Sequence, residues 1–279
     1  FISPSWIPAE LLGDGDYINI PFSKEIKDNK DFSEDYCKML GFYLAEGSIA
    51  RYRTGKLGQI DFSFHIDEKH YSEFIKKQLE EKYSVNAKIT ERSSKTTRHV
   101  ILCNQDVASH LYDLCGKGSK TKKLNNILMT LPPQKQKQIL YGWIMGDGHL
   151  TRKFGKKGRF RLVSVTSISI DLISQMMQIA LTCGFYPKLY YQKRGGPRIN
   201  TSYTLHFSKE DAEKIAEECD FKHMVDFSNY RNTNIGMIKH KGEVFAPIQS
   251  VWSEKFNNNV YDLEVENNHS YVINGVGVH

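Results

Sequence analysis

Two carboxylate side chains, Glu46 and Asp147, stand at matching places near the ends of two apolar stretches. The stretches read MLGFYLAEGSIA over residues 39–50 and ILYGWIMGDGHL over residues 139–150. A carboxylate in the last turn of a helix faces the negative end of the helix dipole, which costs about 0.3–1 kcal/mol. Two close carboxylates also repel each other unless a cation lies between them, and hard oxygen ligands favour Mg²⁺ or Ca²⁺. The pair therefore predicts a metal site that both stretches share.

Small residues recur at a spacing of four in both stretches, namely Gly41 and Ala45 in the first and Gly142 and Gly146 in the second. Residues at i and i+4 lie on one face of a helix, and a face without bulk lets another backbone come very close. The simplest partner for one such face is the other. The glycine after each acid suits the left-handed cap that ends many helices. Taken singly, either stretch fits the plainer interpretation of a buried helix that ends in a turn.

The elements around the two stretches repeat as well. The two acids are 101 residues apart (147 − 46 = 101), which is about the size of a small domain. Hydrophobic periodicity predicts the order helix, strand, strand, helix, strand, strand, helix in both copies. The predicted elements are residues 33–46, 48–53, 59–65, 68–83, 87–92, 97–102 and 105–115, and then a helix ending at 147 followed by 149–154, 159–164, 171–183, 187–193, 202–207 and 209–219. The repeat predicts an α+β fold of two pseudo-symmetric αββαββα units, over residues 31–131 and 132–230.

The two ends of the chain, residues 1–25 and 243–279, have strand-like patterns instead. A short strand-rich segment does not bury itself alone. We therefore expect the C-terminal segment to supply strand partners for the N-terminal one.

The composition is that of a globular protein with a moderate positive charge. The chain has 279 residues, 40% of them hydrophobic, and a formal net charge of +6. This length allows two domains or one domain with a duplicated interior, and the charge indicates a polyanion partner only if it is clustered. The five cysteines are odd in number and form no CxxC pair, which disfavours a zinc site and a disulfide framework.

Targeting signals are equally sparse. The sequence has no apolar run as long as the roughly 18 residues that indicate a membrane-spanning helix. The start, FISPSWIPAE, has no basic region, no signal-peptide core and no initiator Met. We expect an intracellular protein of the cytoplasm or nucleoid, without membrane contact, whose sequence is a piece of something longer.

The two copies of small residue, acid and glycine resemble the motif of the LAGLIDADG homing endonucleases, although Glu46 stands where Asp is commoner. The resemblance implies a double-motif, single-chain enzyme that cuts both strands of a long asymmetric double-stranded DNA target. It implies that Glu46 and Asp147 are catalytic and bind Mg²⁺, and that Ca²⁺ binds without supporting cleavage. It also implies a monomer whose pseudo-twofold axis matches the local symmetry of B-DNA, with both repeats forming a DNA-binding saddle.

The same family keeps a lysine near the end of each repeat, in a basic pocket that orders water. By position these lysines are Lys122, 76 residues past the first acid (122 − 46 = 76), and Lys222, 75 residues past the second (222 − 147 = 75). Lys120 and Lys123 are alternatives to Lys122, and solvated surface is the plainer interpretation of all of them.

Polar and basic residues of the predicted strands complete the implied DNA interface. Gln59 resembles the family's glutamine of the second strand, whereas Arg159 or Arg161 occupies that region of the second repeat. Strand ribbons fit a major groove, where outward side chains read bases and basic groups contact phosphates. An ordinary basic hairpin surface is the plainer alternative. The predicted DNA-binding residues are Arg51, Arg53, Arg92, Arg98, Arg152, Arg159, Arg161, Lys193, Arg194 and Arg198.

Both ends resemble the splicing segments of inteins. The tail VYDLEVENNHSYVINGVGVH is similar to the C-terminal splicing blocks, and the stem WIPAE with GDYINIP is similar to the end of the N-terminal splicing half. The resemblance implies a partial splicing (Hint) module around an inserted endonuclease. It implies that Asp262 is the block acid, that His269 assists, and that His279 is the penultimate histidine, which protonates the leaving amine while a terminal Asn cyclises.

The chain departs from the splicing pattern at both ends. No Asn follows His279, and residue 1 is Phe1 where the segment with a Cys or Ser nucleophile would precede it. We therefore expect no splicing in cis, and a missing N-terminal intein fragment as a partner. A trimmed chain, the C-terminal piece of a split intein and a degenerate remnant all fit this pattern.

Two other functions fit the same residues. One is a protein of this fold that grips DNA, or RNA as a maturase, without cutting it. The other is the C-terminal part of a split intein that acts in protein splicing while its endonuclease is silent. Retention of both acids argues against the first alternative, because pure binding has no use for them.

Overall fold

The computed structural model describes most of the chain, as two compact units. The described residues are 4–22, 25–52, 55–91, 96–155, 158–192, 201–207, 209–219, 237–248, 250–259, 261, 265–266, 271–273 and 276–278, with the description of 151–162, 209–210, 239, 272–273 and 277–278 limited to the backbone. The first unit combines Phe1–Phe22 with Asn234–His279, and the second is Ser23–Thr233.

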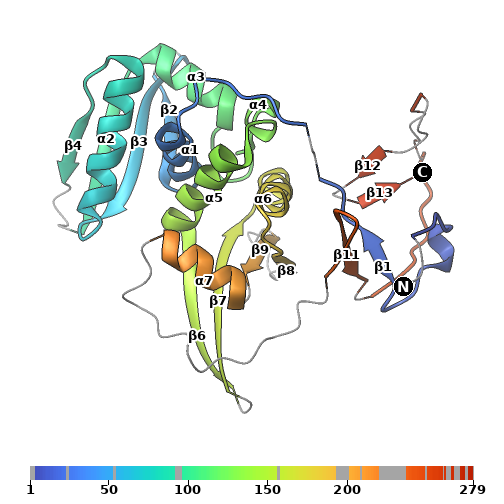
Figure 1. The fold of residues 1–279 in the computed structure, drawn as a ribbon. Helices are drawn as coiled ribbons and strands as arrows, with labels where there is room; N and C mark the ends of the chain where they lie inside the picture. The colour runs from blue at the N-terminus through green and yellow to red at the C-terminus, as the bar shows by residue number, and fades with distance from the viewer. Residues whose placement is uncertain are drawn as a thin grey trace. The chain divides into compact units, whose positions relative to one another are not determined.

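The second unit contains the same order of seven elements twice (Figure 1). The first copy consists of α1 (Glu34–Glu46), β2 (Gly47–Arg51), β3 (Leu57–His65), α2 (Lys69–Tyr83), β4 (Lys88–Glu91), β5 (Thr97–Cys103) and α3 (Gln105–Cys115). The second copy consists of α5 (Pro133–Asp147), β6 (Gly148–Gly155), β7 (Gly158–Ser167), α6 (Ile170–Thr182), β8 (Lys188–Gln192), β9 (Ser202–Phe207) and α7 (Lys209–Glu218).

Each copy builds a four-stranded antiparallel sheet, in the orders β2-β3-β5-β4 and β6-β7-β9-β8. The predicted mixed α/β fold with antiparallel sheets is confirmed. A short helix, α4 (Asn126–Met129), lies between the copies and was not predicted. The Asn125 side chain caps it by accepting the backbone N–H of Ile127 at 3.1 Å, which is a signal the sequence carried.

Local sequence explains where the main elements begin. The side-chain oxygens of Ser33, Asn104 and Ser169 accept backbone N–H groups in the first turns of α1, α3 and α6 at 3.1, 3.0 and 3.2 Å. Strand β3 alternates as predicted, with every second side chain buried against the helices. Its other side chains, from Gln59 onward, lie on the opposite face of the sheet.

The glycines that follow the two acids correct one expectation. Gly47 and Gly148 do not adopt the left-handed conformation, because their φ/ψ values of −80°/145° and −75°/145° are extended. A Cβ atom at Gly47 would come closer than 3.0 Å to atoms of Tyr43, and one at Gly148 would collide in the same way with Ile144. Glycine is needed at these positions because each strand starts directly against the last turn of its helix.

Helices α1 and α5 lie side by side at the centre of the second unit (Figure 1). A single hydrophobic cluster includes side chains from both copies, among them the fully buried Phe42 of α1 and Trp143 of α5. The two copies therefore share one core, and this core fixes the relative position of their sheets and helix ends.

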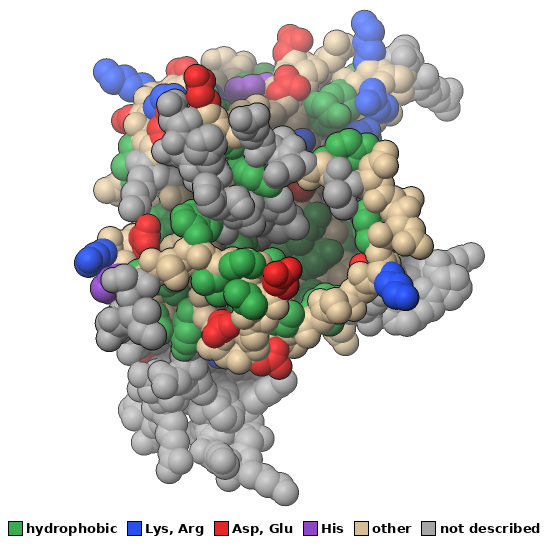
Figure 2. All heavy atoms as spheres, turned by 90° about the vertical axis from the view of Figure 1, so that its right-hand side faces the viewer, with side chains coloured by type: hydrophobic (Ala, Val, Ile, Leu, Met, Phe, Trp, Pro, Cys, Tyr) green, Lys and Arg blue, Asp and Glu red, His purple; other side chains and the backbone are tan. Residues whose placement is uncertain are grey.

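The first unit is smaller and contains little buried apolar surface. Strand β1 (Tyr17–Asn19) pairs with β11 (Glu243–Pro247), which also pairs with β10 (Ile238–His240), while β12 (Tyr271–Ile273) and β13 (Val276–Val278) form a hairpin. The expected pairing of the N-terminal segment with the C-terminal one is therefore confirmed. Hydrophobic side chains remain at the molecular surface (Figure 2). Among the described residues of this unit, the large exposed ones are Trp6, Ile7, Leu11, Tyr17, Val251, Trp252, Phe256 and Tyr261.

Candidate active site

The small faces of α1 and α5 pack against each other as predicted. A Cβ atom added at Gly41 would lie closer than 3.0 Å to the backbone oxygen of Ile139, and one added at Gly142 would be as close to that of Lys38. Real Cβ atoms essentially never come so near, so the two backbones are in direct contact. The close contact therefore fixes the position of one helix along the other.

The two acids stand together at the end of this seam. Glu46 is the last residue of α1 and Asp147 is the last residue of α5. A Cβ atom at Gly146 would lie 3.3 Å from Cγ of Glu46, so the residue before Asp147 touches the other acid. Among the described residues, no hydrogen bond or ion pair involves either carboxylate. Two neighbouring carboxylates that form no ion pair can bind a cation between them.

The electrostatics of the seam favour this interpretation. Burial, together with the nearby Asp147 and Glu68 carboxylates, raises the pKa of Glu46 to about 7, and Lys122 opposes this shift. Burial also raises the pKa of Asp147, which Lys122 again opposes, although its side chain is the more exposed of the two. Without a metal, each acid therefore holds a proton more readily than usual. A divalent cation would replace those protons.

The donor set fits magnesium better than zinc. Among the described residues, no group of three or more His, Cys, Asp and Glu side chains is placed to hold a metal ion. Magnesium is commonly held by one or two carboxylates together with water and substrate phosphates, whereas zinc needs three or four protein ligands. Glu46 and Asp147 would supply two such carboxylates.

The raised pKa of Glu46 predicts how the stability of the metal-free protein depends on pH. The folded protein binds the proton of Glu46 more tightly than the unfolded chain does, and this difference stabilises the fold. The stabilisation is complete below the ordinary Glu pKa of 4.5 and is lost as the pH rises through about 7. We expect the free energy of unfolding to fall across this window in the presence of a chelator, and to fall less in Glu46→Gln. Urea denaturation at a series of pH values measures both proteins, and equal pH slopes would contradict the prediction.

Lys122 lies beside the acids, but its ammonium group faces the helix end. Its Nζ donates to the backbone oxygens of Tyr43, Leu44 and Gly47 at 2.8, 2.9 and 2.7 Å, and only 6% of the residue is exposed. Burial lowers the pKa of Lys122 to about 8, while Asp147, Cys115 and Glu46 hold it up. The other predicted pocket lysine, Lys222, lies outside the described residues.

The register of β3 identifies a polar residue that the sequence did not. Gln59 pairs with Ala50, but Asp61 pairs with Ser48, the second residue after Glu46. Asp61 is therefore nearer than Gln59 to the end of α1 on the same sheet face. Its carboxylate is 2.9 Å from Nδ1 of His99, whose residue is only 5% exposed. Alternation placed Gln59 and Asp61 on one face, but only the register decides between them.

The described DNA-binding candidates differ in their surroundings. Arg51 is exposed and donates to the backbone oxygen of Gly55 at 2.6 Å. Arg98 lies opposite Phe64 on the helix-covered side of the sheet and forms ion pairs with Glu91 at 3.1 Å and Glu73 at 3.7 Å. The protein itself therefore neutralises the charge of Arg98.

The remaining predicted residues are not placed in detail. The backbones of Arg152 and Arg161 pair across β6 and β7, and Arg159 pairs with Phe154. The other predicted DNA contacts, Arg53, Arg92, Lys193, Arg194 and Arg198, lie outside the described residues, as do the predicted splicing residues Asp262, His269 and His279.

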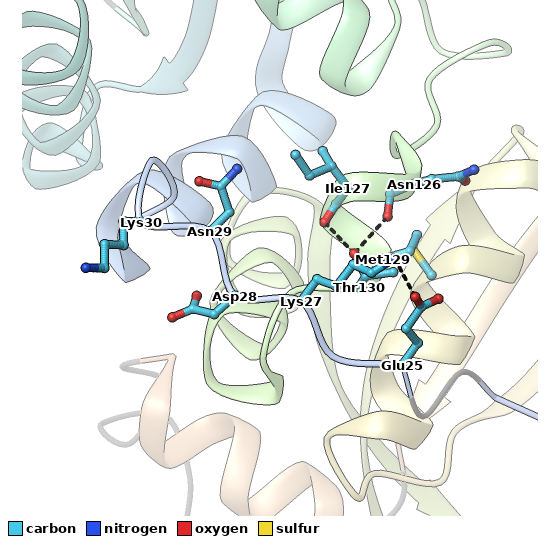
Figure 3. A pocket seen from close by; sticks show the side chains of 9 residues that line it. All are labelled: Glu25, Lys27, Asp28, Asn29, Lys30, Asn126, Ile127, Met129 and Thr130. Carbon is cyan, nitrogen blue, oxygen red and sulfur yellow. Dashed lines mark hydrogen bonds and ion pairs between the residues drawn. The ribbon is translucent and has the colours of Figure 1, made fainter.

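A separate groove of about 730 Å³ lies between residues 25–30 and α4 (Figure 3). Three of its charged side chains form ion pairs, Lys27 with Glu25 at 2.5 Å and Asp28 with Lys135 at 2.5 Å. Neither acid of the seam lines it. The groove is therefore separate from the candidate site at the ends of α1 and α5.

Comparison with known proteins identifies one family model. Residues 134–220, which run from α5 to the end of the second copy, match the LAGLIDADG-like domain. No described helix has both the length and the apolar character to cross a membrane.

The chain is also similar to parts of much longer proteins. It is 25% identical to an iron-sulfur cluster assembly SufBD family protein of Mycobacterium tuberculosis, over 99% of this chain and 30% of that protein. It is 25% identical to the ATP-dependent DNA helicase Hel308 of Thermococcus kodakarensis, over 85% of this chain and 20% of the helicase. It is 21% identical to a DNA polymerase of Thermococcus litoralis, over 86% of this chain and 15% of the polymerase. The chain thus spans less than a third of the length of each.

Solved structures of homing endonucleases are similar at low identity. Mesophilic variants of the homing endonuclease I-DmoI share 12% identity with a TM-score of 0.48, over 71% of this chain and 100% of that one. The homing endonuclease I-WcaI bound to its DNA recognition sequence shares 13% identity with a TM-score of 0.45, over 68% of this chain and 82% of that one.

Proposed function

We propose that this chain is a site-specific double-stranded DNA endonuclease of the LAGLIDADG homing type. The observation that carries the proposal is the pair of neighbouring carboxylates, Glu46 and Asp147, at the end of the α1–α5 seam, neither of which forms an ion pair among the described residues. The LAGLIDADG-like match of residues 134–220 supports the assignment of Asp147 as the second acid of such a pair. Because both acids belong to one chain, a monomer would suffice.

The residues divide the work of phosphodiester hydrolysis as follows. Glu46 and Asp147 would hold Mg²⁺, which when bound stabilises charge on the phosphate and favours ionisation of a water molecule. The seam fixes the two carboxylates, because the helix backbones have no room to slide. The sheet face that carries Gln59 and Asp61 supplies polar groups beside the acids. Each repeat would then address one half of a long asymmetric target.

A plasmid-nicking assay tests the proposal directly. The expected result is linearisation of a plasmid that carries the target when Mg²⁺ is present, and no cutting in chelator or in Ca²⁺. The target is found by selecting cleaved molecules from a randomised DNA library. Binding of DNA without cutting at any Mg²⁺ concentration would favour the non-cutting binding protein or maturase instead.

We expect the affinity for DNA to fall steeply with added salt. Basic groups that contact phosphates release counterions, so a protein with 6–10 such contacts loses about 10³–10⁵-fold in affinity between about 50 and 200 mM salt. Fluorescence anisotropy with labelled target in Ca²⁺ measures this dependence. A flat response would contradict a saddle that contacts the DNA backbone.

We further propose that the endonuclease is of intein origin. The chain aligns over most of its length with a minor part of three proteins whose names describe unrelated activities, which is the pattern of one inserted element in different hosts. The joining of both chain ends in the first unit supports this origin. The exposed Trp6, Leu11 and Trp252 of that unit fit a module completed by a further N-terminal fragment. Ligated product after addition of that fragment to a chain with the terminal Asn would test the splicing role.

A further inference from the structure

The ammonium group of Lys122 has no hydrogen-bond donor left for a substrate. A lysine side chain has three N–H donors and no acceptor. Three backbone oxygens, those of Tyr43, Leu44 and Gly47, accept from Nζ at 2.8, 2.9 and 2.7 Å. With 6% of the residue exposed, the group is also shielded from solvent. To contact a phosphate or a water, Lys122 would have to give up one of these bonds.

The three acceptors surround the position of Glu46. Tyr43 and Leu44 belong to the last turn of α1, where backbone oxygens have few helical partners, and Gly47 begins β2. The oxygen of Tyr43 also accepts the backbone N–H of Gly47. A cation at this end of a helix also offsets the negative end of the helix dipole. Helix α1 has no basic residue of its own in its last turn. Lys122 thus supplies both the positive charge and the hydrogen-bond donors that stabilise the last turn of α1, which carries Glu46.

The second repeat holds the backbone of Lys122 in place. The hydroxyl of Ser169, which also caps α6, donates to the backbone oxygen of Lys122 at 2.7 Å. The neighbouring Leu124 exchanges two hydrogen bonds of 2.7 Å with the side chain of Gln175 in α6. On the other side, the Tyr43 hydroxyl donates to the backbone oxygen of Gly116 at 2.7 Å. The repeat that carries Asp147 therefore also determines where the Glu46 turn lies.

We propose that Lys122 is a positioning residue, which caps α1 and fixes the Glu46 turn relative to Asp147, and that it does not touch the reacting phosphate. The proposal rests on the proposed function for the role of the two acids. The basic contact at the phosphate would come from another side chain, and the exposed Lys120 and Lys123 of the same loop are the nearest in sequence.

Reductive methylation of the unaltered protein is the first test, since it needs no substitution. We expect Lys122 to resist modification while Lys120 and Lys123 react. We also expect bound DNA target in Ca²⁺ to protect an exposed lysine of this loop without changing Lys122. Modification of Lys122 at the rate of Lys120 would overturn the capped arrangement, whether or not the chain cuts DNA.

The second test compares Lys122→Met with Lys120→Met. For Lys122→Met we expect faster amide hydrogen exchange at residues 44–48 than in the unaltered protein, and Mg²⁺ binding weakened by about 10- to 100-fold, as when a group that orients a metal ligand is removed. For Lys120→Met we expect neither change. Lys122→Met with normal exchange and normal Mg²⁺ binding but slow cleavage would place Lys122 at the reacting atoms and overturn the proposal. If Lys122→Met does not fold, the methylation result decides.

Absence of cleavage by the unaltered protein would have a different meaning. It would remove the proposed endonuclease function, while methylation and exchange would still report whether Lys122 caps α1. Rescue separates the outcomes further, because Lys122→Arg keeps a cation and several donors at the helix end. We expect Lys122→Arg to restore part of the exchange protection that Lys122→Met loses, and no recovery would count against the cap.

Discussion

Asp147→Asn is expected to abolish DNA cleavage while leaving DNA binding intact. The amide keeps the size and hydrogen-bonding capacity of the side chain but removes the charge that a divalent cation needs. Removing one group that stabilises transition-state charge costs about 10²–10³-fold in rate, and loss of a shared metal ligand should cost at least as much. Single-turnover cleavage in Mg²⁺ measures the rate, and a binding titration in Ca²⁺ measures the affinity.

Two further variants make this result specific. Glu46→Gln should lose cleavage to a similar extent, because Glu46 and Asp147 end neighbouring helices. Asp113→Asn makes the same chemical change at an exposed residue of α3 and should cut like the unaltered protein. Cutting by Asp147→Asn at the unaltered rate would remove Asp147 from the site.

Gly142→Ala is expected to produce the largest loss of stability. The added Cβ atom would lie closer than 3.0 Å to the backbone oxygen of Lys38, and a backbone atom at a packed seam has no alternative rotamer. Overpacking of a rigid core typically costs about 1–3 kcal/mol and sometimes more, and we expect the free energy of unfolding to fall by about 3 kcal/mol. Urea denaturation followed by circular dichroism measures the change.

A matched glycine provides the control. Gly13→Ala adds the same atom where the nearest neighbour, an oxygen of Asp16, would be 3.7 Å away. We expect this variant to stay within about 0.5 kcal/mol of the unaltered protein, as most surface changes do. If Gly142→Ala were equally mild, the close approach of α1 and α5 would be refuted, and the acids would lose the seam that brings them together.

The seam and its acids were predictable because their signal is local and repeated. The four-residue spacing of Gly41 and Ala45, and of Gly142 and Gly146, indicates which helix faces carry only small side chains. The duplication indicates that there are two such helices. The order of the surrounding elements follows from periodicity for the same reason. These features depend on residues three or four positions apart, which a single sequence displays directly.

Other features depend on register or on distant partners, which a single sequence does not display. Asp61, rather than Gln59, lies opposite the start of β2 because of one particular alignment of the strands. Arg98 was predicted to bind DNA, but Glu73 and Glu91 come from α2 and β4 to neutralise it. The extended backbone of Gly47 follows from the tight helix-to-strand junction and not from the residue type.

For Lys122, the sequence predicts the position of the residue but not its hydrogen-bond partners. Its separation from Glu46 in the sequence predicts a position beside the acid, and in the structure its Nζ donates to the oxygen of the neighbouring Gly47. The direction of its ammonium group, however, depends on the backbone oxygens at the end of α1 and on the hydrogen bond from Ser169. Burial and the number of available donors decide its contacts, and both are properties of the folded chain.

Anomalous diffraction from crystals grown with Mn²⁺ in place of Mg²⁺ tests the shared metal site most directly. We expect anomalous density within bonding distance of carboxylate oxygens from both Glu46 and Asp147, and loss of that density in the Asp147→Asn protein. Density bound elsewhere, or bound to only one of the two acids with the other turned away, would contradict a cation held jointly by the two helices.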